Sequence, residues 1–157
     1  MKRTDLPPQL SKILTEVPYV TLASVCPDGR PWNTPVWGCF DDVLNLYWAS
    51  WPKNQHSQNV AHDPRIFVVS YDSRATEGDG LGIYMEMTAK MLTGKREIEQ
   101  ARKIYTTNFG EDLQHEPFTG KCPRRLYKAT VQKIWFNSDA YIKGNFVDIR
   151  REVTAKR

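Results

Sequence analysis

Runs of apolar residues, interrupted by short polar breaks, predict short strands with tight connections in the first third of the chain. Apolar and β-branched residues dominate 19–25, 32–40 and 43–49, and these runs are separated by Pro27-Asp28-Gly29 and Asp41-Asp42. Connections this short join antiparallel neighbours, because a parallel pair needs a crossover of about a dozen residues or more. We therefore expect an antiparallel three-stranded meander in this part of the chain.

Further strands are predicted downstream of the meander. Strands are expected over 65–71, 126–136 and 146–153, and the segment 73–81, which contains two glycines, is expected to be a loop. Between 82 and 92 apolar and polar residues alternate, which predicts one buried and one exposed or liganded face. The apolar face would hold Ile83, Met85, Met87 and Ala89, and the other face Tyr84, Glu86, Thr88 and Lys90.

Three segments have the pattern of helices. Residues 6–16 carry apolar side chains three or four positions apart, and residues 53–62 form a polar helix that Asp63-Pro64 ends, because the residue before proline disfavours helical geometry. The longest helix is predicted over 95–109, followed by Gly110 in the usual stop position. Its apolar stripe consists of Ile98, Ala101, Tyr105 and Phe109.

These elements define the expected fold class. Many short strands with only two or three helices suit a mainly β protein, in which an antiparallel barrel is flanked by helices. The chain has 157 residues, shows no repeat or linker, and matches the usual size of one domain. A single domain over residues 1–157 is therefore expected.

Charge and composition exclude several classes of function. The 22 Lys and Arg against 18 Asp and Glu give a formal net charge of +4, but the basic residues are spread along the chain. Nucleic-acid binders concentrate them in a stripe with interleaved aromatics, so no nucleic-acid partner is expected. No apolar run is long enough for a signal peptide or a membrane span, which predicts a cytoplasmic protein without a membrane partner.

The cysteines and histidines do not have the spacing of a metal site. The three cysteines are far apart and are expected to be free thiols, and the three histidines are also dispersed. No metal is therefore expected. The cysteines are Cys26, Cys39 and Cys122, and the histidines are His56, His62 and His115.

Several local patterns, taken in order, resemble the FMN-binding split barrels of the pyridoxamine-phosphate-oxidase-like family. The resemblance extends over roughly residues 15–92, about half of the chain, and rests on the order and spacing of short motifs. These motifs are Tyr19-Val20-Thr21-Leu22-Ala23, Asp28-Gly29-Arg30-Pro31, Thr34-Pro35-Val36-Trp37, Leu46-Tyr47-Trp48-Ala49-Ser50, Asn59-Val60 and Asp63-Pro64-Arg65-Ile66.

The resemblance implies a set of FMN-binding residues. The second strand would lie along the flavin ring through Thr34, Pro35, Val36 and Trp37, and Tyr84 would contact the ring from the partner subunit. The FMN phosphate would be bound by Ala49, Ser50, Lys53, Gln55, His56 and Ser57. The chain departs from the family in one respect: Gln55 and His56 stand where relatives often carry an Arg and Lys pair.

The implied function is that of an FMN-dependent oxidoreductase acting on an unknown small-molecule substrate, with no catalytic side chain assigned. Two alternatives stay open: a flavin-binding or haem-binding module without turnover, and a reductase that uses a deazaflavin (F420) on the same barrel. The residues also have simpler explanations. Trp37 would be explained by ordinary barrel packing, and the segment 53–62 by an exposed polar helix without a ligand. Glu86 would be explained by a surface pair with a lysine.

A homodimer is expected for two reasons. The resemblance implies that the flavin lies between two barrels, and the predicted third strand is apolar on both faces, whereas a lone small barrel has only one interior. One face would hold Leu44, Leu46 and Trp48, and the other Val43, Tyr47 and Ala49.

Overall fold

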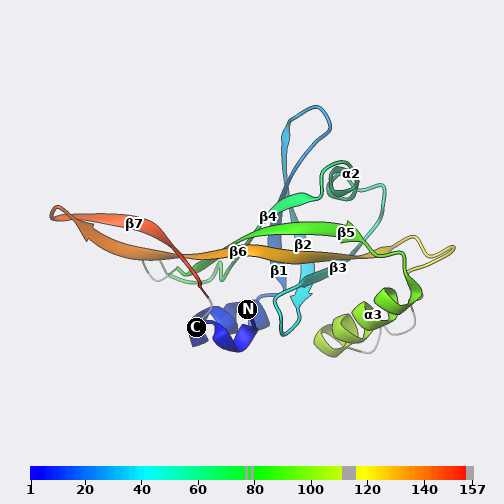
Figure 1. Ribbon diagram of the computed structural model, residues 1–157, viewed down its shortest axis with the longest axis horizontal. Coiled ribbons are helices and arrows are strands. Elements are labelled where there is room, and N and C mark those ends of the chain that lie inside the picture. Colours follow the sequence, from blue (N-terminus) through cyan, green and yellow to red (C-terminus); the bar gives the residue numbers. More distant parts are fainter. Residues whose placement is uncertain (77, 79, 111–115, 155–157) are drawn as a thin grey trace.

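The computed structural model describes residues 1–76, 78, 80–110 and 116–154 and consists of a β-barrel with helices around it (Figure 1). A short 3-10 helix (Arg3–Asp5) precedes three α-helices, which are α1 (Pro8–Glu16), α2 (Gln55–His62) and α3 (Lys95–Phe109). The strands are β1 (Tyr19–Val25), β2 (Pro31–Phe40), β3 (Leu46–Ser50), β4 (Arg65–Tyr71), β5 (Gly82–Met91), β6 (Arg125–Ile142) and β7 (Asn145–Glu152).

All strands belong to one antiparallel sheet that closes on itself. The order is β3-β2-β1-β4-β5-β6-β7, and an additional pairing of β3 with β6 turns the first six strands into a ring. The expected antiparallel barrel with flanking helices is therefore confirmed. The predicted hairpin of β1 and β2 is present, with Tyr19 opposite Trp37 and Val25 opposite Pro31.

The long strand β6 joins three parts of the molecule. Its first residues pair with β3, its middle pairs with β5, and its end pairs with β7. The last part projects from the barrel as a two-stranded ribbon, visible at the left of Figure 1. The sequence predicts only 126–136, because polar residues such as Asn137 and Asp139 interrupt the apolar pattern, and pairing with β7 extends the strand.

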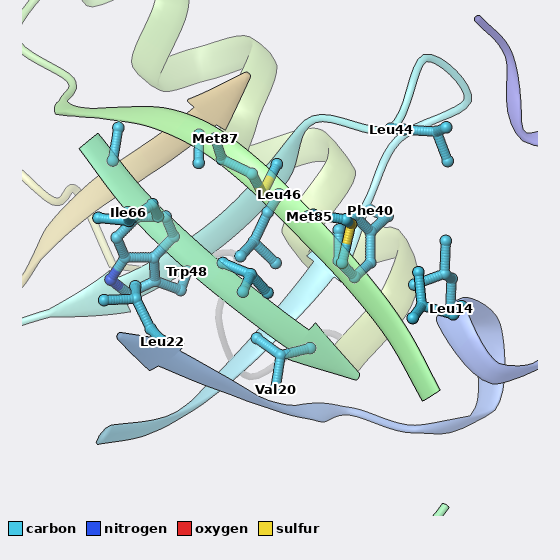
Figure 2. Close-up of a cluster of buried hydrophobic side chains, with 14 of the residues drawn as sticks. Leu14, Val20, Leu22, Phe40, Leu44, Leu46, Trp48, Ile66, Met85 and Met87 are labelled. Atoms are coloured by element: carbon cyan, nitrogen blue, oxygen red, sulfur yellow. The ribbon is translucent and has the colours of Figure 1, made fainter. Parts of the chain in front are cut away.

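The barrel interior is filled by the inward residues of each strand, as the alternation predicts. Ile83, Met85, Met87 and Ala89 are all buried, and the Trp48 ring stacks on Tyr127 with 5.3 Å between ring centroids. Figure 2 shows these side chains converging from several strands. The residues labelled there are Leu14, Val20, Leu22, Phe40, Leu44, Leu46, Trp48, Ile66, Met85 and Met87.

A second apolar cluster lies outside the barrel, beneath α3. The outward side chains of β2 and β3, including Cys39 and Tyr47, pack there against Ile98, Ala101 and Tyr105 of the helix. The second apolar face of the third strand is thus covered by the same chain. This face therefore does not require a second subunit, contrary to the expectation from the sequence. The homodimer itself stays a prediction.

The third strand also begins later than the sequence pattern predicts. Val43 and Leu44 lie in the turn before β3, and Leu44 adopts a positive φ of 65°. The Asp41 carboxylate organises this turn by accepting hydrogen bonds from the backbone N–H groups of Val43 (3.0 Å) and Asn45 (2.9 Å). Leu44 is nevertheless buried, so its apolar character reflects the core and not the strand.

A substitution at Gly38 tests the close approach of β2 and β3. A Cβ there would lie 2.9 Å from the Tyr47 carbonyl oxygen and 2.8 Å from Leu46 Cδ1. We expect Gly38→Ala to lower the free energy of unfolding by about 1–3 kcal/mol, as other overpacked sites do, measured by urea denaturation. Gly80→Ala is the control, because no heavy atom lies within 4 Å of its added Cβ. Equal stability of both variants would contradict this packing.

Candidate functional site

The barrel is split along one edge of β2. Only Gly38, Cys39 and Phe40 pair with β3, whereas residues 31–37 of the same strand pair with β1 alone. Within the described residues, no strand pairs with the other edge of 31–37. The backbone groups on this edge are therefore free to bind a ligand.

The ladder between β1 and β2 defines which backbone groups point to the free edge. The Cys26 N–H donates to the Arg30 carbonyl (2.9 Å) and the Gly38 N–H to the Pro18 carbonyl (2.9 Å), so even-numbered residues of β2 face β1. Because the direction alternates along an antiparallel strand, odd-numbered residues face the opposite way. The free edge thus presents the N–H groups of Asn33 and Trp37 and the carbonyl of Pro35.

The four residues predicted to contact a flavin ring do not share one face. Thr34 and Val36 lie opposite the inward residues Leu22 and Val20, whereas Pro35 and Trp37 face outwards. Val36 is buried in the core and its backbone groups face β1, so it does not reach the free edge. Trp37 is 48% exposed and contacts the rings of Tyr19 and Phe109.

Tyr105 of α3 lies where β2 and β3 separate. Its hydroxyl is 3.5 Å from the Trp37 carbonyl oxygen, a long contact for a hydrogen bond. Burial raises the pKa of Tyr105 to about 12, and the backbone of Ala49 acts in the opposite direction through a hydrogen bond. The helix therefore supports the split from outside, next to Ala49, a predicted phosphate residue that is half-buried.

A buried cluster of polar side chains occupies the end of β3 and the start of α2. The Ser50 hydroxyl oxygen lies 2.8 Å from His56 Nε2 and accepts hydrogen bonds from Asn54 Nδ2 (3.0 Å) and the Ser57 hydroxyl (3.3 Å). These three contacts bring together Ser50, His56 and Ser57, which the sequence predicted as phosphate residues. Their burial excludes an exposed polar helix at this end of α2.

The Ser50 hydroxyl and His56 Nε2 share a buried hydrogen bond of 2.8 Å. Burial lowers the pKa of His56, which favours the neutral imidazole. A neutral ring can either donate or accept at Nε2, depending on its tautomer.

The cluster continues across the barrel end to β1. The Asn59 side chain, which is fully buried, donates to the Ser24 hydroxyl (3.0 Å) and accepts from Gln55 Nε2 (2.8 Å). The predicted site residues do not include Asn54, Asn59 or Ser24. Ser24 could have been found, because it is the only polar residue among the inward positions Val20, Leu22 and Ser24 of β1.

Lys53 and Tyr84 lie apart from this cluster. Lys53 is exposed in the turn before α2, and its backbone carbonyl accepts a hydrogen bond from Gln58. Tyr84 lies on the outer face of β5, opposite Trp135, with the Arg150 guanidinium 4.2 Å from its ring centroid. No contact joins Tyr84 to Ser50 in the part of the chain that the structure describes, so Tyr84 is separate from the predicted phosphate residues.

The described residues contain no group of three or more His, Cys, Asp or Glu side chains that could hold a metal ion. Cys26, Cys39 and Cys122 are free thiols, as predicted, and His115 lies outside the described residues. Among the helices within the described ranges, none is long and apolar enough to cross a membrane. The polar cluster and the free edge of β2 are therefore the strongest candidates for a ligand site.

Comparison with known proteins identifies the family. A family model for pyridoxamine 5'-phosphate oxidase matches residues 6–138, which is most of the chain. The barrel with its split edge is thus a cofactor-binding fold, and the chain belongs to the pyridoxamine 5'-phosphate oxidase family. Comparison with curated proteins gives no match.

Solved structures share the fold but little sequence. HutZ, a haem storage protein from Vibrio cholerae, is 16% identical with a TM-score of 0.70, over 82% of this chain and 92% of that chain. An F420 reductase is 19% identical with a TM-score of 0.61, over 82% and 98%. A FAD-binding protein from Mesorhizobium loti is 16% identical with a TM-score of 0.60, over 83% and 94%. At these identities the likeness shows the fold alone.

The buried His56 predicts a pH dependence of stability. Burial lowers its pKa below the ordinary value of 6.5, so the unfolded chain binds the proton more readily than the folded one. We expect the Tm of the cofactor-free protein to fall as the pH decreases from about 7 to about 5. Thermal unfolding followed by circular dichroism measures this effect.

The matched variant for this test is His56→Gln, which keeps a polar side chain but cannot take up the proton. Its Tm should change less over the same pH range than that of the parent. The carboxyl groups of Asp63 and Asp72 have pKa values of about 2. The stabilisation that these ionised groups provide is therefore lost mainly at a lower pH than this test covers. Identical pH profiles of variant and parent would show that His56 does not carry the effect.

Proposed function

We propose that this chain is an FMN-dependent oxidoreductase that acts on a small-molecule substrate as a single domain over residues 1–157. One observation carries the proposal: a buried cluster of hydroxyl, amide and imidazole groups lies at the end of β3, next to the unpaired edge of β2. A flavin mononucleotide has a phosphate at one end and a planar ring at the other. The polar cluster matches the phosphate, and the unpaired edge of β2 matches the ring.

The free edge of β2 is suited to the flavin ring. The ring has polar atoms along its edge, which pair with backbone N–H and C=O groups such as those of Asn33, Pro35 and Trp37. The half-exposed Trp37 indole adds an apolar surface beside this edge. Thr34 and Val36 belong to the same strand segment, but their backbone groups face β1, so the odd-numbered residues would make the contacts with the ring.

The polar cluster is suited to the phosphate. Ser50 and Ser57 supply hydroxyl donors, Asn54 supplies an amide, and Lys53 and Gln55 extend the donors around the start of α2. A dianion close to His56 favours the protonated imidazole, so binding of FMN would be accompanied by proton uptake at this residue. Reorientation of the Ser50 hydroxyl would then release it to donate to a phosphate oxygen.

The flavin, when bound, supplies the redox chemistry, and the protein binds and orients it. This division of labour agrees with the absence of a recognisable catalytic group among the described residues. Haem is less well suited to the cluster, because His56 Nε2, a nitrogen able to act as axial ligand, is already engaged by Ser50. A deazaflavin would use the same free edge, because its ring has the same polar pyrimidine edge as a flavin.

The proposed assembly is a homodimer formed through the outer face of β1, β4 and β5. Three large apolar side chains, Tyr19, Phe67 and Tyr71, are exposed there. A groove of about 690 Å³ opens where β1 and β4 diverge, lined by residues that include Val25, Phe67 and Met87. A second copy on this face would cover these apolar groups and bring its Tyr84 towards the flavin.

The proposed cofactor is tested by colour and mass. Protein purified from cells should show the two visible absorption bands of an oxidised flavin, and mass spectrometry of the released ligand should give the mass of FMN. A Soret band would instead support the haem-binding alternative, and a deazaflavin mass would support the F420-type reductase. Protein that stays colourless after incubation with excess FMN would contradict the proposal.

The proposed dimer is tested by a charge on the outer face. Phe67 is 37% exposed and stacks on Trp135, so Phe67→Lys would place an ammonium group in the interface. We expect light scattering to report a dimer for the parent and a monomer for this variant at micromolar concentration, since an unpaired buried charge costs several kcal/mol. Val43→Lys, in the turn before β3, is the control and should stay dimeric. A monomeric parent with bound FMN would contradict the assembly.

A further inference from the structure

The proposed phosphate site has hydroxyl, amide and imidazole donors but only one cation on its own helix and turn, the exposed Lys53. Phosphate sites in proteins commonly use arginine, because its planar guanidinium binds two oxygens at once. We propose that Arg125, at the start of β6, supplies the fixed positive charge of this site and binds the phosphate group of the cofactor. This inference rests on the proposed function.

Strand pairing brings Arg125 to the cluster. Ser50 and Arg125 are directly opposite each other at the last rung between β3 and β6, two residues along from the pair Trp48 and Tyr127. Directly opposed residues project to the same face of a sheet, as the stacked rings of Trp48 and Tyr127 show. Arg125 therefore emerges on the same face as Ser50.

The surroundings of Tyr127 connect the two sides of the site. Burial raises the pKa of Tyr127, whereas a hydrogen bond with Ser57 and the charge of Arg125 both act to lower it. Tyr127 thus interacts with a residue of the polar cluster and with the guanidinium at once. The positive charge of Arg125 acts on Tyr127, which borders the cluster, although the hydrogen bonds of its guanidinium are to residues 120–124.

The guanidinium is held in place with one side unoccupied. Its Nη1 donates to the carbonyls of Cys122 and Arg124 (2.9 Å to Arg124), and its Nη2 donates to the Gly120 carbonyl at 3.0 Å. The Nε–H and one of the two Nη2–H groups have no hydrogen-bond partner in the described part of the chain. These groups are available to donate to an anionic ligand.

Arg125 has no ion-pair partner among the described residues. Carbonyl oxygens are its only hydrogen-bond partners in that part of the chain. The adjacent Arg124 differs in this respect, because its guanidinium forms an ion pair with Glu116. A half-buried guanidinium that is held by carbonyl oxygens is suited to an anionic ligand.

Two flavins that differ only in the phosphate test this assignment. FMN and riboflavin share the ring, so a phosphate contact affects the dissociation constant of FMN and leaves that of riboflavin unchanged. We expect Arg125→Gln to raise the Kd of FMN roughly tenfold or more, the range of a charge-assisted hydrogen bond, and Arg125→Lys to raise it less. Arg124→Gln is the matched control and should bind both flavins like the parent.

Equal affinities of Arg125→Gln and the parent for FMN would overturn the assignment, and so would an equal loss for FMN and riboflavin. A second measurement works without any flavin: inorganic phosphate at millimolar concentration should raise the Tm of the cofactor-free parent and of Arg124→Gln, but not that of Arg125→Gln. Phosphate protection without flavin binding would refute the proposed function and uphold the anion site. Absence of protection in the parent would overturn the anion site, even in a protein that binds riboflavin.

Discussion

The pairing of β3 with β6 is the constraint on which the rest of this structure depends. β3 has five residues, and all of them pair with β6, whereas only three pair with β2. Closing the ring on that side therefore leaves residues 31–37 of β2 without a partner on one edge. The same pairing carries Ser50 to the mouth of the split. A short strand used on both of its edges thus produces both the barrel and the opening in it.

The polar cluster at this opening follows from the cost of burying polar groups. Each buried hydroxyl or amide needs a hydrogen-bond partner. Ser50 of β3 is paired with Ser57 of α2, and Ser24 of β1 is paired with Asn59 of α2. Such a network holds α2 against the barrel end together with the buried side chain of Val60. It also gives the helix polar groups that could donate to the acceptor oxygens of a ligand.

The periodic segments could be predicted from the sequence with correct bounds. β1, β4 and α3 match their predicted ranges, because their apolar positions recur with an uninterrupted period. The start of β3 could not be predicted, since it depends on how the Asp41 carboxylate ties the preceding turn. Resemblance to a family led to Ser50, His56 and Ser57. Asn59 and Arg125 were out of reach, because their neighbours are distant in sequence and are brought close only by strand register.

The closure of the barrel also has a consequence for the order in which the chain folds. The ring closes only when β3 pairs with β6, for example Leu46 with Ala129. Nearly the whole barrel must therefore be synthesised before this last pairing can form. Until then β3 and β5 are open edges of an unfinished sheet, and such edges pair readily with other chains. Long-range closure of this kind is slow, because loop entropy is lost before the contacts form. The open edges of newly synthesised chains can therefore pair with other chains until β6 has been synthesised and closes the barrel.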